Sequence, residues 1–556
     1  MYLKAVPAKN SQKSEIEDVM PSDEIKKFIG RYFEYQKNIQ DKVNEKTIHV
    51  DEVSSQVASF YENIRRVVDW KDEHAMRQMA IERVLKRHLF LNKKSENNYF
   101  SGESIVTELI RGGHFPNDKI SRDKIREIKH LVEKYSFIIK NVPAPIKKIT
   151  VSQFYDFIFK TAACETEEII DSSNYQRSNI LIEFMEETIG KSIYVGPRAK
   201  DKTKITSKQK EVQIFIGVQQ ALFKFDRPII IYNLLKRYYP EWFIYEENSV
   251  HKITKNVYYI FDDIEKCFNH PLADKFYAIC ESHDTPFLLL GDVIENDSHK
   301  FNISLTSPKE IKKMILGAYQ TRLGTLKNRV RRSAFYSTVS VFLSKIVLIY
   351  LIEIPLAKVV TGGFDFLSSI VDILIPTLLM VTLVATIKLP PSNNFELILK
   401  DIYRIIYKGQ SKGEYEVELY PSKSFILKTI FGLIYIVSFL VCLSGIILLL
   451  TWLNFPPISY VIFIIFTSVI MFTGSVIRNR SRELHVTQEK EGFLGIIIDP
   501  FILPIVYFGR WLSTKWQKYN VVAIFLVILV DSPFFMFVDF LEQWRYFMKE
   551  KKESIH

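Results

Sequence analysis

The sequence predicts an all-α protein built from a cytoplasmic helical N-terminal domain followed by a polytopic transmembrane helix bundle. Three observations lead to this prediction. Apolar residues recur with a helical period before residue 300, where strand-like alternation is nearly absent. Nearly every long apolar run lies after Arg332. A mean hydropathy of +0.02 in a chain with 25% charged residues requires the two kinds of residue to be segregated along the chain.

The 556 residues divide into five expected regions. Residues 1–20 are polar, lack the apolar core of a signal peptide and are expected to be a disordered lead-in. A helical cytoplasmic region is expected over 21–142 and a helical cytoplasmic domain over 146–306. The membrane domain is expected over 307–541, and a charged cytoplasmic tail over 542–556.

The N-terminal half consists mainly of amphipathic segments with helix start and stop signals. Ser121 is an expected N-cap, Gly112-Gly113 is a C-cap signal, and Pro143-Ala144-Pro145 marks the expected boundary between the two cytoplasmic regions. The apolar period predicts helices at 22–48, 52–91, 104–111, 121–141, 150–171, 174–189, 207–225, 228–238, 252–268 and 285–295.

Two segments of this half allow a second interpretation. Residues 191–211, KSIYVGPRAKDKTKITSKQKE, are expected to form a flexible basic loop, either simply solvated or in contact with anionic lipid or nucleic acid. The aromatic cluster from Tyr238 to Phe243 is expected to close the end of a helical hairpin core. The alternative is a patch that binds a ligand or a partner.

No motif that carries chemistry is found in the N-terminal half of the sequence. Walker-type phosphate loops and the HExxH, GxSxG and GxGxxG motifs are all missing from this half. The four cysteines lie far apart without ligand spacing, as expected for free thiols in a reducing compartment. The sequence therefore predicts no enzyme activity, no cofactor and no metal site.

Six apolar segments after Arg332 are expected to span the membrane, since about 20 apolar residues cross the hydrocarbon core as a helix. They cover about 335–357, 364–388, 425–453, 457–477, 494–512 and 520–541. The fifth is broken by Asp499-Pro500, so it either spans or is re-entrant. The side of the membrane on which the C-terminus lies depends on that choice.

Basic flanks orient the spans. Lys327, Arg329, Arg331 and Arg332 precede the first span, and further Lys and Arg residues lie between the second and third and after the fourth. Because basic loops stay on the cytoplasmic side, the sequence predicts a multi-pass protein of the cell membrane with a cytoplasmic N-terminus. Ser307-Pro308 followed by Glu310 is a strong helix start, and the helix is expected to continue into the first span.

A short amphipathic helix is expected between the second and third spans. Residues 395–408 carry one apolar stripe bordered by Lys400, Arg404 and Lys408, which is typical of a helix lying in the membrane interface against anionic lipid headgroups. The alternative is packing on the cytoplasmic domain. The period-two alternation of residues 414–420 indicates a short strand.

Ionisable residues inside the spans are the main functional signal, because a charge in the hydrocarbon core usually faces protein or water. They are Lys345, Glu353, Asp372, Asp499 and Asp531. Each of the four acids precedes a proline by one to four residues, which indicates broken helices. From their depths along the spans we expect Lys345 and Asp531 to form a charge pair.

Two function classes follow from these features. The first is a membrane scaffold or assembly factor, with a cytoplasmic domain that binds a protein partner and no nucleic acid. The alternative is an ion- or proton-coupled transporter or channel that uses the intramembrane acids. An intramembrane aspartyl protease is not supported, because the Gly-rich aspartate and Pro-Ala-Leu motifs of presenilin-like enzymes are missing.

The stretches LSKIVLIYLIEIPL at 343–356, IVDILIPTLLM at 370–380 and VDFLEQWRYFMKEKKE at 538–553 resemble those of uncharacterised multi-pass membrane proteins of bacteria. This resemblance implies a membrane location and no particular activity.

Overall fold

The structure is a computed structural model of the chain. It describes residues 20–40, 73–91, 102–111, 114–115, 120–143, 150–350, 354–355, 366–388, 390–391, 393–408, 415–419, 425–453, 455, 457–484, 493–519, 540, 544 and 547. These residues are all-α apart from one pair of short strands, as predicted. The chain divides into two compact units. Unit 1 comprises Met1–Ile315, Leu399–Leu419 and Phe535–His556, and unit 2 comprises Leu316–Ile398 and Tyr420–Phe534.

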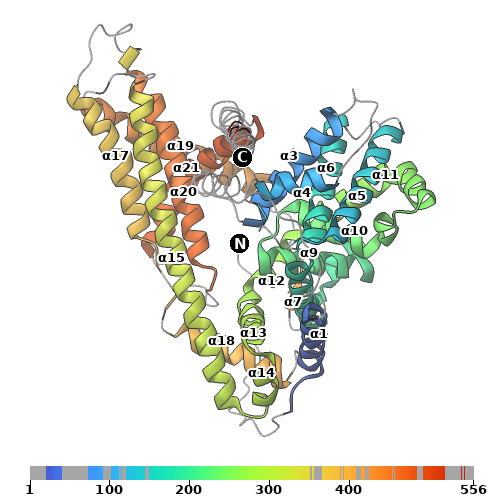
Figure 1. Cartoon of the computed structure of the whole chain (residues 1–556). Coiled ribbons are helices and arrows are strands. Elements are labelled where there is room, and N and C mark those ends of the chain that lie inside the picture. Colours follow the sequence, from blue (N-terminus) through green and yellow to red (C-terminus); the bar gives the residue numbers. More distant parts are fainter. Residues whose placement is uncertain are drawn as a thin grey trace, which may run out of the picture. The chain divides into compact units, whose positions relative to one another are not determined.

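Unit 1 is a body of packed helices (Figure 1). Its helices are α1 (Asp23–Gln40), α3 (Glu73–Leu91), α4 (Gly102–Arg111), α5 (Arg122–Asn141), α6 (Val151–Ile170), α7 (Ser172–Ser192), α8 (Pro197–Thr203), α9 (Ser207–Phe223), α10 (Arg227–Tyr238), the 3-10 helix η2 (Pro240–Phe243), α11 (Glu247–Phe268), α12 (Ala273–Ser282), α13 (Asp284–Asn296) and α14 (Ser298–Ser304). Phe28, Phe184 and Phe287 are buried. Phe28 stacks on Phe184, and Phe287 meets Phe184 edge to face, which joins α1, α7 and α13 in one core.

Helices α5 and α6 lie on either side of the predicted boundary at Pro143-Ala144-Pro145 and belong to the same compact unit. Helix α5 follows the predicted N-cap Ser121 and ends at Asn141 as predicted. Helix α6 begins with a capping box, in which the Thr150 hydroxyl accepts from the backbone N–H of Gln153. Local signals therefore predict where these two helices begin and end.

The predicted basic loop is folded, so that prediction is wrong. Strand β1 (Ile193–Val195) pairs in parallel with strand β2 (Tyr415–Val417), and helix α8 follows directly. The alternation at 414–420 correctly predicts β2. The pairing partner of β1 lies more than 200 residues away in the sequence, so no local pattern could indicate it.

Gly196 lies where β1 turns into α8, and a larger residue there would require the Glu418 side chain to shift. A Cβ atom there would lie 2.1 Å from Oε2 of Glu418, far inside van der Waals contact. The same carboxylate accepts a hydrogen bond from the backbone N–H of Ala199 at 2.9 Å through its other oxygen. A carboxylate at the N-terminus of a helix satisfies an orphan N–H group, so Glu418 fixes the start of α8.

The expected interfacial helix is instead buried in protein. Helix α18 (Asn394–Tyr403) and the π-helical turn Arg404–Lys408 have their apolar stripe inside the structure. The buried side chains are Phe395, Ile398, Leu399, Ile402, Ile405 and Ile406. The interfacial prediction is therefore wrong for this stripe, and the alternative of packing against protein is correct.

Backbone and tyrosine hydrogen bonds hold the end of this segment within unit 1. Ser22 donates to the carbonyls of Ile405 and Ile406, at 2.9 and 2.7 Å. The hydroxyl of Tyr403 donates to the carbonyl of Pro308 at 2.7 Å, and that of Tyr407 to the carbonyl of Leu305 at 3.0 Å. A stripe that is covered in this way is not available to a lipid surface.

Unit 2 contains the apolar helices. Helix α15 (Pro308–Leu348) begins at the predicted proline and continues into the first apolar segment, as expected. The others are α17 (Phe366–Ala385), α19 (Phe425–Trp452), α20 (Pro457–Ser481) and α21 (Phe493–Tyr519). Helix α20 packs against α17 and α21, and α19 packs against α21 (Figure 1).

Two helices in the described part of the chain are long and apolar enough to cross a membrane: Thr429–Trp452 and Ser459–Ser481, with mean hydropathies of 2.8 and 2.3. Only 11% of the first apolar window is buried inside the structure, which distinguishes it from the core helix of a soluble protein. The predicted second span contains a shorter apolar helix, Ile370–Ala385. The predicted span at 520–541 lies almost wholly outside the described residues.

Candidate functional site

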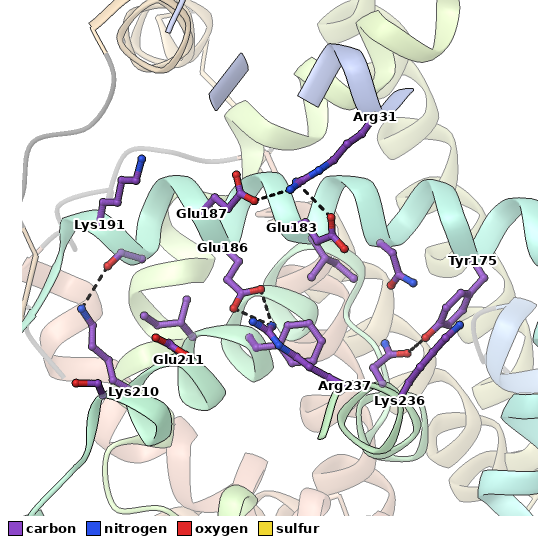
Figure 2. Close-up of a pocket in the computed structure, with 17 residues that line it drawn as sticks. Arg31, Tyr175, Glu183, Glu186, Glu187, Lys191, Lys210, Glu211, Lys236 and Arg237 are labelled. Carbon is purple, nitrogen blue, oxygen red and sulfur yellow. Dashed lines mark hydrogen bonds and ion pairs between the residues drawn. The ribbon is translucent and has the colours of Figure 1, made fainter. Parts of the chain in front are cut away.

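A pocket of about 780 Å³ opens along one face of α7 in unit 1 (Figure 2). This volume is in the range of natural ligand sites. Helix α7 supplies one wall, α9 and α10 supply the other, and Arg31 of α1 reaches in from the rim. The lining residues are Arg31, Tyr175, Asn179, Ile182, Glu183, Glu186, Glu187, Gly190, Lys191, Ser207, Lys210, Glu211, Ile214, Phe215, Asn233, Lys236 and Arg237.

Two guanidinium groups pair with the carboxylates of α7. Arg31 reaches Glu187 at 2.7 Å and Glu183 at 3.2 Å, which ties α1 to α7. Arg237 of α10 donates to both oxygens of Glu186 at 2.8 Å. Its guanidinium also lies 4.5 Å from the ring centroid of Phe215, a cation–π contact that fixes its plane. These ion pairs therefore hold the charged side chains in the middle of the pocket in place.

Burial changes the proton affinity of groups in this pocket. It raises the pKa of Glu186, and the nearby carboxylates of Glu183 and Glu211 add to this effect while Arg237 opposes it. Burial lowers the pKa of Lys210, whose ammonium donates to the carbonyls of Ile193 and Gly190 at 2.6 and 3.3 Å. These hydrogen bonds satisfy carbonyl groups at the C-terminal end of α7, and no carboxylate of the described residues pairs with Lys210 there.

The opposite end of the pocket is built from Tyr175, Asn233 and Lys236. The hydroxyl of Tyr175 donates to the side-chain oxygen of Asn233, and Lys236 lies 4.5 Å from the Tyr175 ring centroid. Burial raises the pKa of the Tyr175 hydroxyl well above its ordinary value, so it remains a neutral donor. Lys236 also pairs with Glu168, which does not line the pocket.

A separate buried ion pair lies under the aromatic cluster. Lys134 of α5 donates to both oxygens of Glu165 in α6, at 2.6 and 2.8 Å, and to the carbonyl of Trp242 at 3.1 Å. The hydroxyls of Tyr135 and Tyr245 donate to the same carboxylate. Every partner here is internal and Trp242 is fully buried, so the prediction that the cluster closes a helical core is confirmed.

A fully buried ion pair lies in the described part of unit 2, and it differs from the expected one. Lys345 of α15 lies 2.5 Å from Asp372 of α17, and neither side chain is more than 2% exposed. The ring of Phe466 in α20 lies 5.5 Å from the same ammonium. The structure thus pairs Lys345 with Asp372, whereas Asp531, the expected partner, lies outside the described residues. The depth estimate places Asp372 in the outer half of its span, away from Lys345, and the distance between the two side chains shows that this estimate is wrong.

The other predicted intramembrane residues are not brought together by the described structure. Asp499 lies within helix α21, and Glu353 is outside the described residues. Among the predicted lipid-surface residues, Lys327, Arg331 and Arg332 are exposed on α15, and Arg329 lies 3.4 Å from Glu483. Lys400 is exposed on α18, Arg404 is half-buried, and Lys408 ends the π-helical turn.

Sequence reasoning missed the pocket. Its residues come from α1, α7, α9 and α10, and no short motif links them. The available signal was the charged stripe Glu183, Glu186, Glu187 and Lys191 on one face of the predicted helix at 174–189, which extends to Ser192. Across the described ranges, no group of three or more His, Cys, Asp or Glu side chains could hold a metal ion.

Comparison with known proteins gives no further guide to these sites. No family model, no curated protein and no solved structure matches the chain.

Proposed function

We propose that the chain is a multi-pass integral membrane protein that acts as a scaffold or assembly factor, with a helical cytoplasmic body that binds a protein partner. The observation that carries the proposal is the exposed apolar surface of α19. Leu433, Val437 and Leu440 are all more than half exposed on this helix. An apolar helix that protein does not cover requires a lipid environment or an extensive partner surface.

The charge distribution and the sequence support the cytoplasmic location of the helical body and its binding of a partner. The Lys and Arg flanks favour the cytoplasm for the N-terminal body and for the basic residues Lys327 to Arg332, where anionic lipid headgroups would attract them. The resemblance to uncharacterised bacterial multi-pass proteins agrees with a location in the cell membrane. The lining of the unit 1 pocket is rich in charged groups of both signs, which suits recognition of a partner through charge complementarity.

Membrane extraction and cross-linking test the proposal. The full chain should stay in the membrane pellet through an alkaline carbonate wash and require detergent for release. Lysine cross-linking in intact membranes, followed by mass spectrometry, should recover a defined protein partner joined to residues of unit 1. Release by carbonate would exclude an integral membrane protein, and cross-links confined to unit 2 would exclude a partner-binding body.

The alternative function is an ion- or proton-coupled transporter or channel. One observation favours it: the acid of the buried Lys345–Asp372 pair lies four residues before Pro376, inside α17. Proline cannot donate to the carbonyl four residues earlier, and acids at broken helices form ion sites in many transporters. Asp372→Asn distinguishes the two functions. A transporter would accumulate normally and lose ion flux in proteoliposomes, whereas a scaffold would lose folded protein.

A further inference from the structure

The unit 1 pocket has an ordered sequence of charges along α7. Lys191 and Lys210 lie at one end, next to Gly190, and Lys236 lies over Tyr175 at the other (Figure 2). Between these ends the carboxylates of Glu183, Glu186, Glu187 and Glu211 face the guanidiniums of Arg31 and Arg237. Four carboxylates against two guanidiniums leave the middle negative, so the pocket is positive, negative and positive in order.

The end cations present positive groups to the pocket. Lys191 and Lys236 form ion pairs with Glu24 and Glu168, and neither carboxylate lines the pocket, so each lysine turns the positive side of its ion pair toward it. Lys210 is held by two carbonyl oxygens, which leaves the third N–H of its ammonium for another acceptor. A bound segment would therefore meet positive charge at both ends.

The floor and the length of the pocket limit the size of its occupant. Ile182, Ile214 and Phe215 form an apolar floor. Tyr175 and Lys191 are 16 positions apart on one helix, which corresponds to roughly 24 Å at 1.5 Å per residue. An extended chain rises about 3.3 Å per residue, so about seven residues cover this distance.

We infer that this pocket binds an extended segment of a partner protein, about seven residues long, with an acidic residue at each end and a lysine or arginine in the middle. The inference deepens the proposed scaffold function and rests on it. A simple anion would be repelled by the four central carboxylates, and a simple cation by the basic ends. A segment with acidic ends and a basic middle complements both the basic ends and the acidic middle of the pocket, and its apolar residues cover the floor.

Two labelled peptides of equal composition test the charge order on the full-length protein in detergent. Both are blocked at their termini and carry one lysine and two aspartates among alanine and leucine. In the matched peptide the lysine is at position 4 and the aspartates are at 1 and 7. In the scrambled peptide the lysine is at position 1 and the aspartates are at 4 and 7. Fluorescence anisotropy should show about tenfold tighter binding of the matched peptide at low salt, and less difference at high salt.

Charge reversal at Glu211 provides the specific variant. Its side chain is exposed and makes no hydrogen bond or ion pair with the described residues, so Glu211→Lys should not disturb folding. It should weaken the matched peptide about tenfold and improve the scrambled one, which places aspartate at the centre. Asp274→Lys is the control, because Asp274 is exposed on α12 and lies outside the pocket.

Equal binding of the two peptides, absence of binding by both, or an equal effect of Glu211→Lys and Asp274→Lys would overturn the inference. These outcomes are distinguishable from failure of the scaffold function. A protein that resists carbonate and cross-links to a partner through unit 1, but does not discriminate the peptides, retains the proposed function and binds its partner elsewhere.

Discussion

Lys345 and Asp372 form a buried ion pair in unit 2. Their side chains are almost completely inaccessible, and the surrounding helices are apolar. Desolvation of two charges is expensive, and only close mutual contact offsets it. The pair also links α15 to α17.

We predict that neutralising either partner alone will destabilise unit 2 more than neutralising both. Lys345→Met and Asp372→Asn should each cost about 3–5 kcal/mol, because the remaining charge is left buried without its partner. The double variant should recover much of the loss in detergent-solubilised protein, measured by thermal unfolding and by accumulation. Combining Lys345→Met with Asp531→Asn serves as the comparison. Recovery there, with none in the Asp372 combination, would show that Asp531 is the true partner.

Glu186 provides a pH-dependent prediction for the pocket. Its pKa is raised from 4.5, first by burial and then by neighbouring carboxylates. A raised folded-state pKa contributes stability that is present below about pH 4.5 and is lost as pH rises through the folded value. The Glu186→Gln variant has no carboxyl group to ionise at this position, so it does not lose stability in this way. The free energy of unfolding of the variant, compared with that of the wild type, should therefore increase with pH from 4.5 upward. Denaturant unfolding across pH 4.5 to 7 measures the difference, and a constant difference would contradict the prediction.

At the scale of elements, the described part of unit 2 contains a close crossing of α20 and α21. Gly509 of α21 lies so near α20 that a Cβ atom would fall 2.0 Å from the carbonyl oxygen of Ser468. Small residues at such positions let apolar helices approach closely, which supplies van der Waals contact in the absence of a hydrophobic driving force. Gly445 of α19 differs, since nothing lies within 4 Å of its Cβ position.

These two glycines form a matched pair for mutation. Gly509→Ala should force α20 and α21 apart and cost about 1–3 kcal/mol through overpacking. Gly445→Ala should leave stability unchanged or raise it slightly, because alanine favours the helix. The thermal unfolding of both variants in the same detergent gives the comparison. Similar unfolding temperatures for the two variants would show that the crossing is not close in solution.

Local signals in the sequence predicted individual elements well, because caps and breakers act within a few residues. Ser121, Ser307-Pro308 and the alternation at 414–420 each gave the correct element. Long-range partners could not be predicted in this way. The pairing of β1 with β2, the cover over the 395–406 stripe and the partner of Lys345 all depend on contacts between distant segments. The pocket was missed for the same reason, since its wall combines four helices.

At the scale of the whole molecule, the two units differ in the kind of surface that they expose. Unit 1 buries its apolar residues and exposes many paired charges, for example Arg177 with Glu295 and Lys252 with Glu241. Unit 2 exposes long apolar side chains along α19, including Ile436, Leu448 and Trp452. The exposed apolar surface of unit 2 coincides with a helix that is long and apolar enough to cross a membrane.

The distribution of basic residues predicts the orientation of unit 2 in the membrane. The connection between α19 and α20 contains no Lys or Arg, whereas Lys423 precedes α19 and Arg478 and Arg480 end α20. Basic flanks stay in the cytoplasm, so the α19–α20 connection should lie outside. In a cysteine-free background, Asn454→Cys should react with a membrane-impermeant maleimide in intact cells, and Gly409→Cys should react only after permeabilisation. Labelling of Gly409→Cys but not of Asn454→Cys in intact cells would reverse the orientation and place the basic residues outside. Labelling of both would show that α19 does not span the membrane.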